Sequence, residues 1–121
     1  MKIPSSSYAF IDGSYNIRTK VYGCGIILVD KDGIKHTIKK SDNKIDWAKM
    51  RNVAGEIMGS LEALSLAIDL GMKELTIFYD YEGIAKWPTH QWKTNNPITR
   101  EYARKVNEYF KDIFLFSGGL T

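Results

Sequence analysis

The segment 52–71 constrains the fold more than any other part of the chain. Its large apolar residues recur at the three- and four-residue spacing of a helix and form one stripe: Val53, Ile57, Leu61, Leu64 and Ile68. Asn52 stands at the expected N-cap, and Gly71 stands where a left-handed residue ends a helix. The pattern predicts one long amphipathic helix, which needs an apolar surface to cover.

Runs of β-forming residues on both sides of this helix supply that surface. They are residues 8–11, 21–29, 34–38, 75–79 and 113–116. A turn sequence at Lys31-Asp32-Gly33 makes the first three runs an antiparallel meander, and the lysine-rich stretch 39–44 is predicted to be a solvated loop. The sequence therefore predicts strands before and after the long helix.

Two shorter helical stretches follow the fourth run. One covers residues 82–87 and stops at Pro88, and the other begins at Pro97 with Ala103, Val106 and Phe110 on its buried side. The element order predicts an α/β protein (α+β mixed sheet) with a five-stranded mixed sheet and helices on both faces. We expect one domain over residues 8–121, preceded by a flexible arm at 1–7 and ending in a short flexible tail at 117–121.

Composition narrows the class of protein. With 44% hydrophobic and 26% charged residues, the 121-residue chain is expected to form one globular domain. It contains no apolar run of membrane-spanning length and no signal-peptide pattern, and its single cysteine, Cys24, excludes an internal disulfide and a cysteine-based zinc site. These features predict a reducing, cytoplasmic location. The net charge of +3 permits a polyanionic partner without requiring one.

Three acids stand out by their position. Asp12 and Asp80 each end a predicted strand, and Glu56 lies one turn into the long helix. Gly59 and Ala63 share the side of the helix that carries Glu56, so their small size would let the helix approach the sheet closely. Two alternatives stay open: Asp12 could close an Asx turn, and the three acids could be unrelated. Glu62 points to another face and is expected to be a solvated surface acid.

If the three carboxylates converge, they repel one another unless cations neutralise them. Hard oxygen ligands, without cysteine or clustered histidine, favour Mg²⁺ or Mn²⁺. Such a site suits phosphodiester chemistry, in which one metal ion activates water and a second stabilises the leaving oxygen. Convergence of Asp12, Glu56 and Asp80 would therefore form a metal-dependent site, whereas unrelated positions would leave three separate acids.

These residues and their contexts resemble type 1 ribonuclease H. That family has its first Asp in a strand followed by Gly-Ser, its Glu early in the first long helix, and its next Asp at the end of the fourth strand. Asp12, Glu56 and Asp80 match these positions in order. The segments 52–57 (Asn-Val-Ala-Gly-Glu-Ile) and 80–87 (Asp-Tyr-Glu-Gly-Ile-Ala-Lys-Trp) resemble a bacterial branch, and the likeness runs from Tyr8 to Phe116.

The resemblance implies hydrolysis of the RNA strand of RNA–DNA hybrids. Asp12, Glu56 and Asp80 would hold two Mg²⁺ ions at the scissile phosphate, and the products would carry 5′-phosphate and 3′-hydroxyl ends. Asn52 matches a position that contacts 2′-hydroxyls in the minor groove of the hybrid, and Asn16 matches another loosely. For Asn52, a purely structural role as helix cap stays open. A non-catalytic hybrid-binding domain on the same fold is the alternative function, and an interaction domain with vestigial acids is a third.

Bases and aromatics alternate near the second helix. Lys86, Trp87, Trp92 and Lys93 suit a surface that follows a nucleic-acid backbone, although Trp87 could equally cover the core. His36 and His90 match no site of the family. We expect His36 to point outward from a strand and His90 to lie in a surface loop.

The sequence also departs from the family pattern. Relatives continue past the last strand into a loop with a histidine and a helix that bears a fourth Asp, whereas this sequence ends at Thr121 and has no carboxylate after Asp112. The departure predicts a C-terminally truncated domain that lacks the last helix and has a weakened second metal site and impaired activity. Phe114, Leu115 and Phe116 would then be uncovered and would favour self-association.

Overall fold

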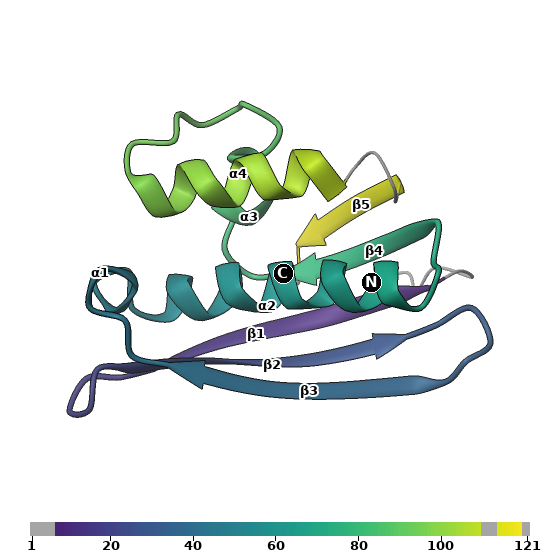
Figure 1. The fold of residues 1–121 in the computed structure, drawn as a ribbon, viewed down its shortest axis with the longest axis horizontal. Coiled ribbons are helices and arrows are strands. Elements are labelled where there is room, and N and C mark those ends of the chain that lie inside the picture. Colours follow the sequence, from purple (N-terminus) through teal and green to yellow (C-terminus); the bar gives the residue numbers. More distant parts are fainter. Residues whose placement is uncertain (1–6, 110–113, 120–121) are drawn as a thin grey trace.

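A computed structural model describes residues 7–109 and the backbone of residues 114–119. The strands are β1 (Tyr8–Asn16), β2 (Val21–Val29), β3 (Lys35–Asp42), β4 (Glu74–Tyr79) and β5 (Phe114–Gly119). The helices are α1 (Ile45–Ala48), α2 (Asn52–Asp69), α3 (Gly83–Lys86) and α4 (Pro97–Tyr109). Together they form a mixed sheet with helices packed on it (Figure 1).

The sheet has the strand order β3-β2-β1-β4-β5. The three strands β1, β2 and β3 form the predicted antiparallel meander, whereas β4 and β5 run parallel to β1 and to each other. The α/β class and the mixed sheet are therefore confirmed. No helix in the described part of the chain is long and apolar enough to cross a membrane.

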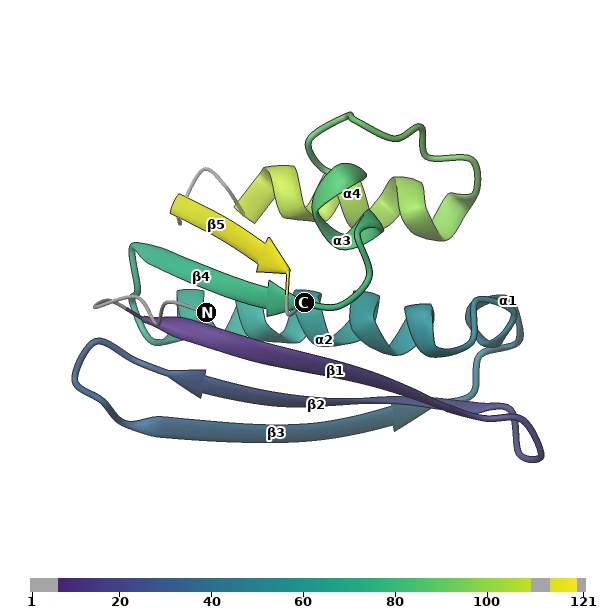
Figure 2. The same ribbon diagram turned by 180° about the vertical axis from the view of Figure 1, so that it is seen from behind.

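Helix α2 packs along β1 and β2, and α4 packs against α2. In Figure 1, α2 crosses in front of the strands, and in Figure 2, seen from behind, the strands lie in front of it. The core lies between them, with Ile11, Ile26 and Leu28 from the sheet against Ile57 and Leu64 from α2. Because α2 and α4 pack together, they share one side of the sheet, so the expected helices on both faces are not found among the described residues.

The sequence predicted the C-terminal end of α2 correctly but not its N-cap. At the C-terminus, Gly71 has φ +71° as predicted, and the amides of Gly71 and Met72 bond back to the carbonyls of Ile68 and Ala67. At the N-terminus the prediction was wrong. Arg51, with φ 56°, occupies the N-cap, and Asn52 is the first helical residue. The short helix α1, which the sequence pattern did not indicate, leads into this unusual entry.

Strand ends extend beyond the apolar runs. β1 continues past Asp12 to Asn16, and β3 continues past Ile38 to Asp42, because the polar residues pair across the ladder with β2. Ser7, predicted in the flexible arm, is buried, and its hydroxyl donates to the Glu74 carbonyl at 2.6 Å. Backbone pairing likewise extends β5 through Ser117–Gly119 into the predicted tail.

Some predictions fall where the structure gives no description. Residues 1–6, 110–113 and 120–121 lie outside the described residues, and these include Phe110 and the rest of the predicted arm and tail. The side chains of Phe114, Leu115 and Phe116 also lie outside the described part, so self-association through them stays a prediction.

Candidate active site

Three glycines bring α2 onto the sheet. A Cβ added to Gly55 would lie 2.0 Å from the Gly23 carbonyl oxygen and 3.0 Å from the Gly13 Cα. A Cβ on Gly13 would in turn lie 2.4 Å from the Asn52 carbonyl oxygen. Helix and strand backbones therefore touch here with no side chain between them. This contact sets the first turns of α2 against the middle of β1, beside Asp12.

The position of Glu56 follows directly from that contact. Its side chain is buried, with 4% exposure, and it accepts hydrogen bonds from the backbone of the segment after β4. The Asp80 amide donates to Glu56 Oε1 at 2.9 Å, and the Tyr81 amide lies 3.2 Å from each carboxylate oxygen. A carboxylate from α2 thus holds the end of β4 in place, which the spacing of acids in the sequence does not reveal.

Asp12 and Asp80 occupy matching positions on neighbouring strands. The last pair of the parallel β1–β4 ladder is Phe10 with Phe78, and each aspartate comes two residues later. Both aspartates are exposed. Asp12 lies within β1, not at its end, and its carboxylate accepts no hydrogen bond from the described residues, so the Asx-turn alternative is not observed.

Burial and neighbouring charges both act on the Glu56 carboxyl. Burial raises the pKa of the Glu56 carboxyl above its ordinary value, and the negative charges of Asp80 and Asp12 raise it further. The amide donors of Asp80 and Tyr81 oppose this rise. In the described part of the chain, none of the three acids forms an ion pair. The site therefore concentrates negative charge that no described cation balances.

The donor set fits a hard divalent cation. It consists of carboxylate oxygens only, and its unbalanced charge is what a cation would neutralise. Within residues 7–109, however, no three acidic, histidine or cysteine side chains already lie close enough to hold a metal ion. Metal binding would therefore have to draw Asp12 and Asp80 toward Glu56, whose own position is fixed by the two amides.

Replacing Glu56 with glutamine tests this picture through stability. Because the Glu56 carboxyl has a raised pKa in the folded protein, its ionisation costs stability as pH rises through that pKa. Glutamine keeps an oxygen for the two amides and cannot ionise. Without divalent metal, we expect the unfolding free energy of Glu56→Gln relative to the native protein to increase from about pH 4 to about pH 8. Urea unfolding at each pH measures this free energy. If the difference between the two proteins does not change with pH, burial of Glu56 does not raise its pKa.

Of the residues predicted to contact nucleic acid, some lie at the surface and one does not. Asn52 is exposed at the start of α2, and Asn16 is exposed at the end of β1, where its side-chain oxygen accepts the Arg18 and Thr19 amides. Trp87 is buried, with 8% exposure, and packs against Tyr102. Trp87 is therefore a core residue, and its prediction as a nucleic-acid contact was wrong because α3 turns it inward.

The remaining residues of that set lie together beside α3. The Lys86 ammonium sits 5.3 Å from the centre of the Trp92 ring, and it also pairs with Glu82 at 3.3 Å. Trp92 is half-buried against Tyr81, the residue that follows Asp80, with ring centres 5.9 Å apart. Aromatic contacts thus connect the carboxylate site to the α3–α4 loop.

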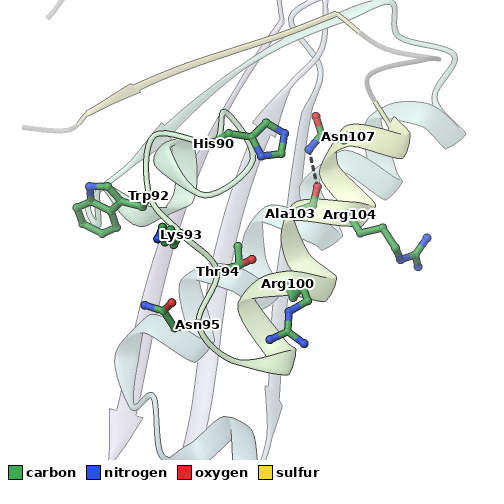
Figure 3. Close-up of a pocket in the computed structure, with 9 residues that line it drawn as sticks. All are labelled: His90, Trp92, Lys93, Thr94, Asn95, Arg100, Ala103, Arg104 and Asn107. Carbon is green, nitrogen blue, oxygen red and sulfur yellow. Dashed lines mark hydrogen bonds between the residues drawn. The ribbon is translucent and has the colours of Figure 1, made fainter.

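Trp92 and Lys93 border a hollow of about 530 Å³ between that loop and α4. Figure 3 shows its labelled side chains, which come from the loop on one side and from α4 on the other. Arg104 is held by Glu101 and Glu108, but Lys93 and Arg100 have no ion-pair partner among the described residues. None of the described residues that line the hollow is acidic. The sequence pattern did not predict that Arg100 lines this hollow, because helical periodicity alone does not tell which exposed position of a helix faces a loop.

The other polar residues behave as simple surface groups. His36 lies 3.0 Å from Asp30 Oδ2 on the meander, and His90 is an exposed loop residue with φ 62°. Glu62 pairs with Lys40 at 2.6 Å, away from Glu56. None of the three belongs to the carboxylate site.

The fold is that of an RNase H-like domain. The profile of the family described as Reverse transcriptase-like matches residues 10–116, nearly the whole chain, and the chain belongs to that family. None of the curated proteins compared with the chain matches it.

Several solved structures share the fold at low identity. RNase H1 from the halophilic archaeon Halobacterium salinarum is 21% identical with a TM-score of 0.78, over 95% of this chain and 85% of that one. The N-terminal RNase H domain of Rv2228c from Mycobacterium tuberculosis is 15% identical with a TM-score of 0.78, over 96% and 86%. LC11-RNase H1 from compost, solved with an RNA/DNA hybrid, is 16% identical with a TM-score of 0.75, over 95% and 85%.

Proposed function

We propose that this protein is a metal-dependent endonuclease that hydrolyses the RNA strand of RNA–DNA hybrids. The observation that carries the proposal is the arrangement of three acids on an RNase H-like fold: Glu56 of α2 accepts the Asp80 amide, and Asp12 and Asp80 each follow the last β1–β4 pair by two residues. The hybrid bound to LC11-RNase H1 supports the choice of substrate.

Each acid has a different part in the proposed site. Asp12 and Asp80 are exposed and can meet a phosphate from solvent, whereas buried Glu56 fixes the backbone that carries Asp80. The three carboxylates would hold Mg²⁺ or Mn²⁺, which when bound activates water and stabilises the leaving oxygen. We propose products with 5′-phosphate and 3′-hydroxyl ends.

Substrate selection would come from residues around the acids. Asn52, which is exposed next to the Gly13 contact, would meet 2′-hydroxyls in the minor groove, and so would Asn16 at the far end of β1. Lys86, Trp92 and Lys93 would contact the nucleic-acid backbone from the α3–α4 loop. This division leaves cleavage to the acids and strand discrimination to neutral and basic groups.

A second candidate is a non-catalytic hybrid-binding domain. It is favoured by one observation, that no three potential metal ligands are already gathered within residues 7–109. Such a domain would bind hybrid with salt-dependent affinity and would never turn it over.

A cleavage assay separates the two candidates. Hybrid with an end-labelled RNA strand is incubated with the protein and Mg²⁺, Mn²⁺ or EDTA, alongside labelled duplex RNA and duplex DNA. We expect metal-dependent cleavage of the RNA strand in the hybrid only. Hybrid binding without cleavage at any Mn²⁺ concentration would favour the binding domain, and no hybrid binding together with no metal-induced rise in melting temperature would reject both.

A further inference from the structure

Two rows of residues cross the sheet beside the acids, on the side away from α2. The ladder registers place Gly25 of β2 between Asp12 and Lys39, and Gly23 between Ser14 and Ser41. That these rows face away from α2 follows from Gly13, the intervening residue of β1, whose added Cβ would meet α2. Lys39, predicted to lie in a loop, is thereby fixed in β3.

The two glycines leave a hollow in this surface. A Cβ on Gly25 would meet nothing within 4 Å, so the space above this position is open. The hollow has a volume of about 390 Å³, and Asp12, Ser14, Lys39 and Ser41 are among the residues that line it. It is therefore continuous with the carboxylate site through Asp12.

The far wall of the hollow is cationic. Lys39 is exposed and has no ion-pair partner in the described ranges, whereas its neighbour Lys40 pairs with Glu62 of α2. The hydroxyls of Ser14 and Ser41 add neutral hydrogen-bond donors along the adjacent row. An ammonium and hydroxyls around a glycine floor are suited to a phosphate group.

We propose that Lys39 and Ser41 bind the RNA-strand phosphate adjacent to the one that is cleaved. This inference rests on the proposed function, in which Asp12, at one wall of the hollow, would help to hold a metal ion at the scissile phosphate. A strand seated on Asp12 and continuing across Gly25 reaches Lys39 next. The positive charge of Lys39 compensates a phosphate that lies beyond the metal ions that the three carboxylates would hold.

Lys39→Gln tests the proposal against a matched control, Lys35→Gln. Lys35 is also exposed, on the same strand and the same side, but it pairs with Val29 at the other end of the ladder. Hybrid affinity is measured by fluorescence anisotropy in EDTA over a range of salt. For Lys39→Gln we expect the slope of log affinity against log salt to become shallower by about 0.7–0.9, as for one lost phosphate contact. Lys35→Gln should keep the native slope.

A second variant leaves the charge in place. Gly25→Val adds a β-branched side chain where the backbone has open space, so the sheet should still form. We expect it to fill the hollow and to weaken hybrid binding in EDTA about as much as Lys39→Gln does. Native affinity in both variants would overturn the proposal.

Hybrids with one uncharged methylphosphonate linkage identify which strand of the hybrid Lys39 contacts. The Lys39→Gln effect should vanish when the neutral linkage lies in the RNA strand next to the cleaved bond, and it should persist when the linkage lies in the DNA strand. The reverse pattern would overturn the assignment to RNA. If native protein cleaves hybrid but the Lys39 and Lys35 variants behave alike, only this inference fails. If native protein binds no hybrid, the proposed function fails and this inference fails with it.

Discussion

Asp12→Asn is expected to lower the rate of metal-dependent hybrid cleavage by about 1,000-fold or more while leaving the fold unchanged. Asp12 is exposed and its carboxylate accepts no hydrogen bond from the described residues, so the substitution breaks no described side-chain hydrogen bond. Asparagine has nearly the same shape but carries no charge, so it holds a divalent cation poorly. The variant should also lose most of the rise in melting temperature that Mg²⁺ or Mn²⁺ gives the native protein.

The matched control for this experiment is Asp69→Asn. Asp69 is an exposed acid in the last turn of α2, at the opposite end of the helix from Glu56. The Asp69→Asn variant should cleave hybrid at the native rate and show the native rise in melting temperature with metal. If Asp12→Asn cleaves hybrid as fast as the control does, the three acids do not form the catalytic site, whatever their arrangement.

The positions of the acids could be predicted from sequence because two local patterns fix them. Strand-forming runs just before Asp12 and Asp80 place each aspartate directly after an apolar strand segment, and helical spacing places Glu56 on the side of α2 that meets the sheet. The hydrogen bonds that the Asp80 and Tyr81 amides donate to Glu56 could not be predicted, because they depend on how far α2 is shifted along β1.

Long-range pairing explains most of what the sequence pattern missed. Lys39 is a polar residue in a lysine-rich stretch, and only its pairing with Gly25 makes it part of a strand. Arg100 faces the α3–α4 loop for a similar reason, since the loop path is set by Trp87 and Trp92 packing on Tyr81. Local propensity is too weak to decide such positions against tertiary contacts.

Gly55→Ala is expected to lower the unfolding free energy by about 3 kcal/mol or more, opposite in sign to what helix propensity predicts. In a helix interior, alanine is normally favoured over glycine by about 1 kcal/mol. Here the new Cβ would lie 2.0 Å from the Gly23 carbonyl oxygen and 3.0 Å from the Ser14 amide nitrogen. Both are backbone atoms in paired strands, so α2 would have to move away from the sheet. Urea unfolding at neutral pH measures the change.

Two other glycines serve as comparisons, because each has more space around it than Gly55 has. A Cβ on Gly59 would lie 3.2 Å from the Cys24 Cβ, which is tight but adjustable, and Gly25 has open space. We expect a small effect for Gly59→Ala and no loss of stability for Gly25→Ala, where alanine also suits a strand better than glycine. Because the Gly55 contact seats α2 beside Asp12, Gly55→Ala should also weaken metal binding in the fraction that stays folded. Equal stability of the Gly55 and Gly25 variants would mean that α2 does not touch the backbone of the sheet, and the basis for bringing Glu56 to the two aspartates would be lost.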